Sequence, residues 1–343
     1  MEGLYIYGVQ FAEKLQTGLQ GLDGLLLAVS SLGDPKTSFL LFFPVTYFLH
    51  QRTGIAVLWT AVVSEWLNLV FKWLLFGERP FWWIHEANVY GTEQSQVQQF
   101  SLSCETGPGS PSGHAMVTGA TLWVMTSSLS AFIYSHSSSL VLKVTPYGLY
   151  MLVLAAVGVS RIFILAHFPH QVVAGCFTGA ALGFLSQWYV PEQKRLHFYI
   201  TSSLGLLLSA VGFYWGLISL GVNLAWSVRL AKKWCSRAEW VRLETLPFSS
   251  LTRDTGAVLG LGLALHCSLY TQIQHWKLTV KQKAACGTLC LVILHIVECI
   301  TLPKFSTTFF YFLFYLKYTF FPVVVIAVVP WLIYTMTEIK KKQ

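Results

Sequence analysis

Five residues that can bind and attack a phosphoryl group stand in three short segments of the sequence. The segment "KWLLFGERP" contains Lys72 and Arg79, "PSGHA" contains His114, and "SRIFILAHFPHQ" contains Arg161 and His167. A guanidinium fork matches phosphate oxygens bidentately, and an ammonium group adds a point charge. A histidine can attack, accept or donate a proton near neutral pH. The set therefore predicts a phosphate site with two catalytic imidazoles.

The second segment ends a stretch that is rich in Gly, Pro and Ser, "CETGPGSPSGHAM" (residues 104–116). Glycine lets the backbone approach a ligand closely, and the first N–H groups of a following helix point outward at the positive end of its dipole. We therefore expect the backbone at Ser112 and Gly113 to bind phosphate beside the three cations. Taken alone, the stretch could be a plain turn with a Ser cap.

Each residue also has a simpler explanation when it is considered alone. Lys72 or Arg79 could extend its charged end toward lipid headgroups. A single His114 or His167 is more often a polar residue that is bonded inside a helical bundle. The phosphate site is favoured because three unrelated explanations would otherwise have to coincide on one face of the protein.

The composition is that of a membrane protein. Of the 343 residues, 54% are hydrophobic and only 11% are charged, against about 25% charged in soluble domains. The mean hydropathy is +0.56. No polar segment is long enough to build a soluble core, so residues 1–343 are expected to form a single domain in the lipid bilayer. The net charge of +8 is scattered between apolar stretches, which argues against a nucleic-acid partner.

Apolar stretches of about 20 residues predict an all-α, polytopic protein with about nine transmembrane helices around a helical phosphatase core. The first stretch is interrupted by "GDPK" (residues 33–36), so we expect it to be kinked or partly re-entrant. Glu65, His266, His295 and Glu298 lie inside apolar stretches, where polar contacts between helices explain them. The nine predicted spans are 25–49, 54–76, 115–135, 147–165, 171–190, 199–222, 254–273, 284–303 and 309–336.

The charges between the spans predict which membrane face carries the motifs. Nine spans put the two termini on opposite sides, and one side then receives four basic segments, which makes it cytoplasmic. The loop Gly77–His114 carries Glu78, Glu86, Glu93 and Glu105 against Arg79, so it belongs on the other side together with all three motif segments. The four basic segments are His50–Arg52, Glu192–His197, His275–Lys283 and Lys340–Lys342.

One loop does not follow the charge rule. Residues 223–253 are basic, yet the count places them on the non-cytoplasmic side, and "WSVRLAKKWCSRAEW" predicts a basic amphipathic segment on the bilayer surface. Cys104 and Cys235 lie in loops on that side. A bridge between these two cysteines is possible, but their spacing does not support it.

The three segments together resemble the tripartite signature of the type 2 phosphatidic acid phosphatase superfamily, here within residues 72–171. The wider text is similar, over nearly the whole chain, to the glucose-6-phosphatase catalytic subunit family. The stretches that carry this resemblance include "EWLNLVFKWLLFGERPFWW", "SRIFILAHFPHQVVAG" and "WCSRAEWVRLETLPFSSL". "GDPK" and "RIFILAHFPHQV" favour the broadly expressed isoform.

The resemblance implies a nine-span enzyme of the endoplasmic reticulum membrane with a lumenal N-terminus, a lumenal site and loop 223–253, and a cytosolic tail at 337–343. Its activity would be hydrolysis of glucose 6-phosphate or a related hexose or hexitol phosphate. His167 would be the nucleophile that forms a phosphohistidine, and His114 the general acid and base. A glucose-6-phosphate transporter would supply the substrate. No metal or other cofactor is expected, because the three cations already supply positive charge.

Two features leave alternatives open. Many superfamily members carry an Asp four residues after the last His, and here Gln171 stands at that position. What orients His167 is therefore open. The motifs alone do not exclude a lipid phosphate phosphatase of the same superfamily. The alternative from another functional class is a non-catalytic membrane protein of the same fold, such as a transporter or a scaffold. The sugar-binding residues are also open, with Trp82, Trp83, Trp234 and Trp240 as candidates.

Overall fold

A computed structural model of the chain describes residues 2–91, 97–191, 194–241, 244, 246–303 and 306–342. Glu93 and Glu192, which entered the prediction of sidedness, lie outside these residues, as do the side chains of Lys340–Lys342. The described residues form helices and loops with no strand, which confirms the all-α class.

The helices follow one another along the chain, and two π-helical turns interrupt the first and last apolar stretches. In order they are α1 (Glu2–Gly18), α2 (Asp23–Leu32), η1 (Ser38–Phe42), α3 (Phe43–Leu49), α4 (Gln51–Leu75), α5 (Pro80–Glu86), α6 (Gly113–His136), α7 (Leu140–Phe163), α8 (Pro169–Ser186), α9 (Leu196–Ser219), α10 (Trp226–Trp234), η2 (Ala238–Trp240), α11 (Pro247–His266), α12 (Ser268–Ile273), α13 (Val280–Cys299), α14 (Thr307–Val323), η4 (Val324–Val328) and α15 (Val329–Lys342).

Six helices in the described part of the chain are long and apolar enough to cross a membrane. A helix lies in each of the nine predicted ranges, but the count of nine spans is not confirmed. The ranges 25–49, 171–190 and 254–273 hold shorter or more polar helices, because α2 and α3 are separated by a break and α11 begins with a polar stretch. The six are Gln51–Glu86, Gly113–His136, Leu140–Phe163, Leu196–Ser219, Val280–Cys299 and Thr307–Ile339.

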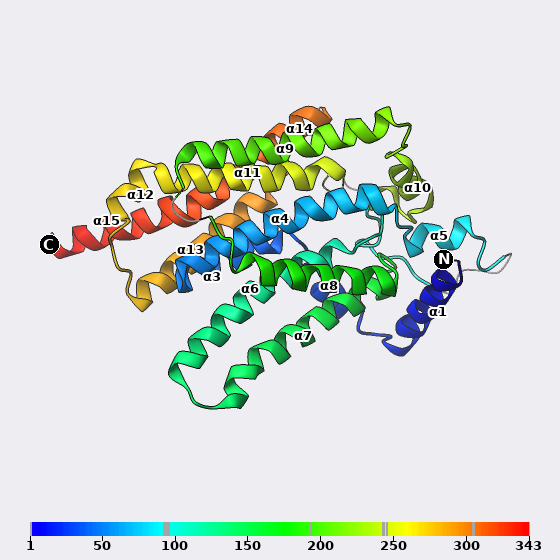
Figure 1. Ribbon diagram of the computed structural model, residues 1–343, viewed down its shortest axis with the longest axis horizontal. Coiled ribbons are helices and arrows are strands. Elements are labelled where there is room, and N and C mark those ends of the chain that lie inside the picture. Colours follow the sequence, from blue (N-terminus) through cyan, green and yellow to red (C-terminus); the bar gives the residue numbers. More distant parts are fainter. Residues whose placement is uncertain are drawn as a thin grey trace.

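The helices pack around α4, which contacts α6 on one side and α11 on the other. In Figure 1, α9, α11 and α14 run side by side, and α6 and α7 form a hairpin that projects from the body. The largest apolar cluster joins α4 to α9, α11 and α14, and it includes Val57, Tyr199, Leu261 and Tyr318. The N-terminus lies with α1, α5 and α10 at one end of the long axis, and the C-terminus lies at the other end.

A stripe of glycines brings α6 and α8 into close contact. A Cβ atom on Gly175 would lie 2.6 Å from the carbonyl oxygen of Ser112, and one on Gly183 would lie 2.6 Å from that of Ala120. Small residues at four-residue intervals let two helix backbones approach each other inside a bundle. This contact holds the start of α6 beside the segment that precedes α8.

The break predicted at "GDPK" is confirmed. Helix α2 ends at Leu32, and the chain turns before η1 begins at Ser38. The turn is stabilised because the N–H of Lys36 donates to Oδ1 of Asp34 over 3.0 Å. Asp34 is thereby held at the point where the chain reverses, and its side chain lines the cavity described below.

Helix α10 covers part of the segment that is predicted to lie on the bilayer surface, and its apolar side chains pack on protein. Trp226, Leu230 and Trp234 pack against the apolar cluster formed by α5 and its neighbours. The rings of Trp82 and Trp226 meet edge to face with their centroids 5.9 Å apart. The apolar face of α10 therefore packs against α5 and its neighbours.

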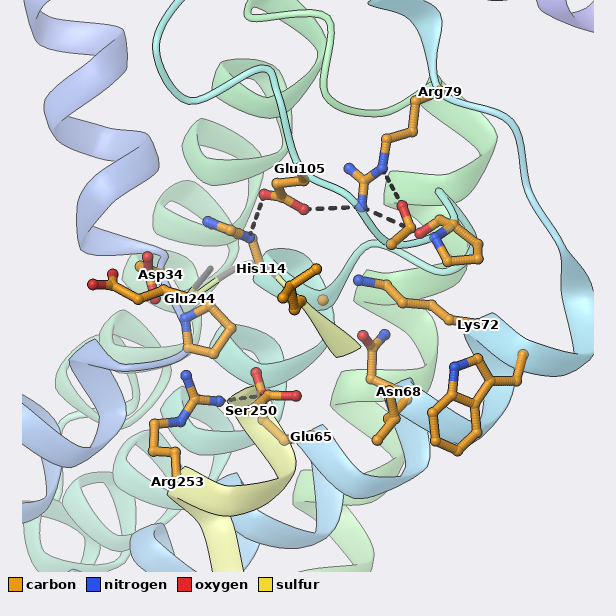
Figure 2. A pocket seen from close by; sticks show the side chains of 17 residues that line it. Asp34, Glu65, Asn68, Lys72, Arg79, Glu105, His114, Glu244, Ser250 and Arg253 are labelled. Carbon is orange, nitrogen blue, oxygen red and sulfur yellow. Dashed lines mark hydrogen bonds and ion pairs between the residues drawn. The ribbon is translucent and has the colours of Figure 1, made fainter. Parts of the chain in front are cut away.

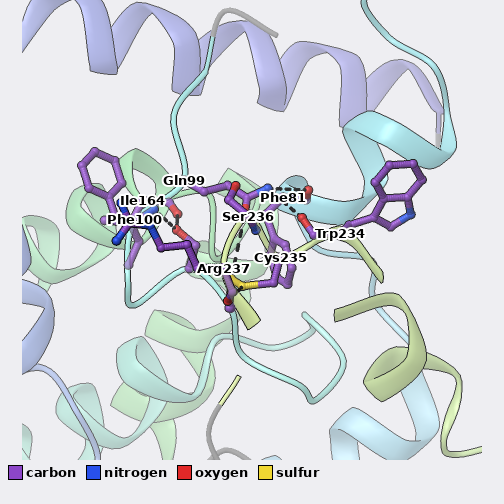
Figure 3. Close-up of a disulfide and its surroundings, with 10 residues drawn as sticks. Phe81, Gln99, Phe100, Ile164, Trp234, Cys235, Ser236 and Arg237 are labelled. Atoms are coloured by element: carbon purple, nitrogen blue, oxygen red, sulfur yellow. Dashed lines mark hydrogen bonds between the residues drawn. A yellow bond between two sulfur atoms is a disulfide. The ribbon is translucent and has the colours of Figure 1, made fainter. Parts of the chain in front are cut away.

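A disulfide joins Cys104 to Cys235, with their Cα atoms 5.7 Å apart, and this settles the pairing that spacing left open. Figure 3 shows Gln99 beside it: Gln99 Nε2 donates to the carbonyl of Trp234, and the N–H of Ser236 donates to Gln99 Oε1. The bond ties the chain after α10 to the loop that carries residue 105.

Candidate active site

The three motif segments meet at the end of the bundle that contains the N-terminus. Lys72 lies in the last turn of α4, His114 in the first turn of α6, and Arg161 in the last turn of α7. Arg79 follows α4 after a turn in which Phe76 has a left-handed φ of 51°. The five predicted side chains therefore come together, and their chemical roles rest on the geometry described next.

A tight turn after α7 explains why Arg161 and His167 are six residues apart. Leu165 adopts a φ of 60°, which non-glycine residues rarely take. The N–H groups of Ala166 and His167 both reach back to the carbonyl of Arg161, over 3.1 and 3.3 Å. This closure resembles the motif that commonly ends a helix with a left-handed residue. It folds His167 back over the end of α7.

Arg79 connects all three segments. Its Nη1 donates to the carbonyl of Ala166 over 3.0 Å, its Nε to that of Gly107 over 2.6 Å, and its Nη2 to that of Pro108 over 3.2 Å. The side chain is fully buried. These bonds hold the guanidinium group in one orientation, with part of it facing a cavity.

His167 is fully buried and is oriented by a backbone carbonyl. Its Nδ1 lies 2.8 Å from the carbonyl oxygen of Gly109, and its Nε2 lies 3.4 Å from Nη1 of Arg79. Burial, and then the charges of Arg79 and Arg161, hold the pKa of His167 well below its ordinary value. A neutral ring that donates from Nδ1 leaves a lone pair on Nε2. That tautomer is the one a nucleophile needs.

Gln171 supports this arrangement without touching His167 itself. Its Nε2 donates to the carbonyl of Glu78 over 2.6 Å, and its Oε1 accepts from the N–H of Phe168 over 3.0 Å. A Cβ on Gly109 would lie 2.8 Å from the Gln171 amide, so only glycine fits there. The Gly109 carbonyl thus orients His167, and Gln171 packs against the loop that presents this carbonyl.

Glu105, which the sequence shows only as one of several acids in its loop, joins the cations. Its Oε2 lies 2.9 Å from Nη2 of Arg79, and its Oε1 pairs with Arg161 and lies 3.7 Å from Nδ1 of His114. Burial raises the pKa of Glu105, but Arg161 and then Arg79 outweigh burial and hold this pKa well below its ordinary value. The carboxylate is therefore ionised and links two arginines with the imidazole.

The start of α6 forms the backbone part of the site. Gly113 lines the cavity, and a Cβ at this position would lie 2.9 Å from Oδ1 of Asn68 and 3.7 Å from Nζ of Lys72. Ser112 is used differently from the expectation. Its N–H donates to the carbonyl of Gln171 and its hydroxyl accepts from the N–H of Ala115. Ser112 therefore supports the helix start, and the first N–H groups of α6 are those nearest the cavity.

These residues form one wall of a cavity of about 160 Å³, shown in Figure 2. Lys72, Arg79, Glu105, Gly113 and His114 line this wall. The rest of the cavity lining includes polar side chains that the motifs do not contain: Asp34, Glu65, Asn68, Glu244, Ser250 and Arg253.

Several ring side chains near the motifs lie outside the cavity, among them candidates for sugar binding. His170, the second histidine of its segment, stacks on Phe168 with ring centroids 5.7 Å apart and does not line the cavity. Trp82 is fully buried and Trp83 nearly so, and both belong to the cluster with α1, away from the cavity. Only Trp240, among the four tryptophans considered, lines a second cavity beside the first.

The charge that the site offers to an anion comes from side chains and from the start of α6. Among the residues with described positions, no three or more His, Cys, Asp or Glu side chains are grouped to hold a metal ion. Lys72 and Arg79 line the cavity together with Gly113 of the first turn of α6, and Arg161 lines the neighbouring cavity. Such an arrangement can bind a phosphoryl group beside Arg79, whose Nη1 lies 3.4 Å from Nε2 of His167.

Comparison with known proteins agrees with this chemistry. A family model described as the PAP2 superfamily matches residues 53–195. Glucose-6-phosphatase 3 of Bos taurus is 49% identical over 334 residues, covering 97% of this chain and 96% of that protein. Its Homo sapiens counterpart is 48% identical with the same coverage. Glucose-6-phosphatase catalytic subunit 1 of Haplochromis nubilus is 38% identical over 348 residues, covering 99% of this chain and 98% of that protein. No solved structure matches the chain.

Proposed function

Because this chain belongs to the glucose-6-phosphatase family, we propose that it hydrolyses glucose 6-phosphate, or a closely related hexose or hexitol phosphate, to the free sugar and phosphate. The observation that carries the proposal is the meeting of Lys72, Arg79 and His114 at one cavity, with Arg161 lining the neighbouring cavity and Nε2 of His167 lying 3.4 Å from Nη1 of Arg79. The identity of 49% to glucose-6-phosphatase 3, higher than the 38% to catalytic subunit 1, agrees with the isoform that the sequence motifs favour.

The first half of the reaction transfers the phosphoryl group to the protein. The lone pair of His167 Nε2 attacks phosphorus as the bond to the sugar oxygen breaks, and the leaving oxygen takes a proton from His114. Lys72, Arg79 and Arg161, with the first N–H groups of α6, hold the phosphoryl oxygens as charge develops on them. The product of this half is a phosphohistidine and the free sugar.

The second half releases phosphate. His114, now neutral, takes a proton from water, and the resulting hydroxide attacks the phosphohistidine. The P–N bond breaks, and its electron pair returns to Nε2 of His167. The Gly109 carbonyl keeps the ring in the same tautomer through both halves, since it accepts from Nδ1.

We place the protein in the endoplasmic reticulum membrane with nine spans as one domain over 1–343, the site in the lumen, the N-terminus lumenal and the tail 337–343 cytosolic. The position of the site and the N-terminus at one end of the long axis, opposite the C-terminus, supports this topology. The disulfide at the same end supports an oxidising compartment. A substrate made in the cytosol then requires a glucose-6-phosphate transporter as functional partner.

The test is phosphate release from glucose 6-phosphate by membranes that carry the protein, intact and opened with detergent. We expect release that rises on opening and that His167→Ala abolishes together with the phosphoenzyme. His170→Ala is the matched control, because His170 lies three residues on and outside the cavity. Near-normal turnover by His167→Ala would remove His167 from the mechanism. Equal release from intact and opened membranes would place the site on the cytosolic face.

A further inference from the structure

The cavity continues beyond the phosphoryl-binding wall into a polar region that the reaction described above does not use. Ten of its 17 lining residues are polar or charged. A second cavity of about 250 Å³ shares Asp34, Glu105, His114, Glu244 and Arg253 with it. The space next to the phosphoryl site is therefore lined by groups that form hydrogen bonds, and an alkyl chain placed there would bury charges without partners.

One row of polar side chains leads away from the phosphoryl site along α4. Glu65, Asn68 and Lys72 are spaced by three and four residues, so they share one face of the helix. Seven residues of α-helix cover roughly 10 Å. Lys72 lies at the end of the row that binds the phosphoryl group, and Glu65 lies at the other end. A phosphorylated six-carbon sugar is long enough to reach from one end to the other.

The far end of this row is held by a buried ion pair. Arg253 of α11 donates from Nη2 to Oε2 of Glu65 and from Nε to Oδ1 of Asp254, the latter over 3.0 Å. Arg253 and Glu65 are 8% and 7% exposed. Oε1 of Glu65 accepts no hydrogen bond from the described residues. The pair therefore presents a fixed acceptor, and Figure 2 shows it on the wall below Asp34 and His114.

Asn68 is positioned in the middle of the row. It is 5% exposed, and its Nδ2 donates to the carbonyl of Pro111 over 3.2 Å. Its Oδ1 accepts from none of the described residues and lies close to Gly113 and Lys72. Asn68 lines the cavity, and an amide oxygen there can accept a hydrogen bond from a ligand. A hydroxyl group of a sugar whose phosphoryl group is bound beside Lys72 can supply it.

Asp34 completes the wall from the opposite side. The break between α2 and η1 brings its carboxylate to the cavity beside His114, and one oxygen is already fixed by the N–H of Lys36. Carboxylates accept strong hydrogen bonds from hydroxyl groups. Asp34, Asn68 and Glu65 together supply acceptors, and Arg253 supplies a charged donor, which is the mixture that a chain of hydroxyl groups can satisfy.

We propose that Asp34, Asn68 and the Glu65–Arg253 pair form the subsite that binds the hydroxyl groups of the leaving sugar and thereby select polyol phosphates over lipid phosphates. This inference rests on the proposed phosphatase function and names the residues that determine its substrate class. None of these four residues belongs to the phosphoryl-transfer steps, so their loss should separate one substrate from another.

The experiment compares two substrates across matched variants. Glucose 6-phosphate carries hydroxyl groups, and phenyl phosphate carries none. Asp34→Asn is expected to lower kcat/KM for glucose 6-phosphate by about 10- to 100-fold, the equivalent of one hydrogen bond to a charged group, and to leave phenyl phosphate hydrolysis unchanged. Asp23→Asn is the control, since Asp23 makes the same change at an exposed position at the start of α2.

Asn68→Ala provides a second variant for the same comparison of substrates, because it removes the buried amide without removing a charge. Deoxy analogues of glucose 6-phosphate extend the comparison: an analogue that lacks the contacted hydroxyl should lose rate with the wild type and lose no more with the variant. Equal losses on glucose 6-phosphate and phenyl phosphate, or no loss on either, would overturn the subsite. Wild-type hydrolysis of phenyl phosphate or phosphatidate without hydrolysis of glucose 6-phosphate would overturn the proposed substrate instead.

Discussion

Replacing Glu105 by Gln tests whether the carboxylate assists proton transfer by His114 or only holds the two arginines. Gln keeps the shape of the side chain and part of its hydrogen bonding, but it removes the negative charge. In the wild type, Oε1 of Glu105 lies 3.7 Å from Nδ1 of His114, and the same carboxylate pairs with Arg79 and Arg161. The change therefore alters electrostatics more than packing.

The size of the effect follows from this distance. Opposite unit charges about 4 Å apart interact by about 4 kcal/mol at an effective dielectric constant of 20. The side chains of His114 and Glu105 are 12% and 19% exposed, so solvent weakens the interaction, and we take about 2 kcal/mol. That energy stabilises the protonated imidazole of His114, which donates its proton to the leaving group. Its loss corresponds to a fall in kcat of about 30-fold.

The assay uses two substrates of similar shape. Phenyl phosphate releases phenolate, a poor leaving group that needs a proton from His114. p-Nitrophenyl phosphate releases p-nitrophenolate, a good leaving group that needs this proton less. We expect Glu105→Gln to slow phenyl phosphate by about 30-fold and p-nitrophenyl phosphate far less. Glu86→Gln is the control, because Glu86 pairs with Lys233 at an exposed position where such pairs contribute little. Equal losses on both substrates would refute a role of Glu105 in proton transfer.

The same variant should also change the pH dependence of stability. The pKa of Glu105 is lower in the folded protein than its ordinary value of about 4.3. Its ion pairs therefore stabilise the fold fully above about pH 4.3, and this stabilisation is lost as the pH falls through the lower folded pKa. Glu105→Gln should lower the free energy of unfolding by about 3 kcal/mol at pH 7, with a smaller difference in acid. A difference that grows in acid would contradict the ionised state.

Four further outcomes are expected. Because the pKa of His167 lies below its ordinary value of about 6.5, the neutral nucleophile persists as the pH is lowered past about 6.5, and on the acidic side phosphoenzyme formation in a single turnover should begin to fall only below that pH; an acidic loss that already begins above that pH would contradict the buried neutral ring. Gly113→Ala should lower kcat/KM by about 100-fold, since its Cβ enters the space between Asn68 and Lys72, whereas Gly119→Ala, with its nearest neighbour at 3.6 Å, should have little effect. Cys104→Ser should lower the free energy of unfolding by about 3–5 kcal/mol by opening a link over 131 residues, and Cys299→Ser, at an exposed free cysteine, should not. Turnover should be unchanged in EDTA, and inhibition that added Mg²⁺ reverses would count against catalysis by side chains alone.

The sequence by itself determined the helical class and singled out the five residues to which we assign the chemistry. These features are local. Apolar stretches of helical length follow from composition, and the spacing of Lys72 from Arg79, or of Arg161 from His167, reflects a single helix end and the turn after it. The break at residues 33–36 was also visible, because Gly and Pro interrupt an apolar run.

Only the tertiary structure decided which partners these residues have. His167 is oriented by the carbonyl of a residue 58 positions away, and a carbonyl group leaves no trace in residue identity. Glu105 meets an arginine 56 positions away, and Glu65 meets Arg253 across 188 residues. Such contacts depend on how α4, α6, α7 and α11 pack together. Helix packing is set by the sum of many weak side-chain contacts, which no single motif encodes.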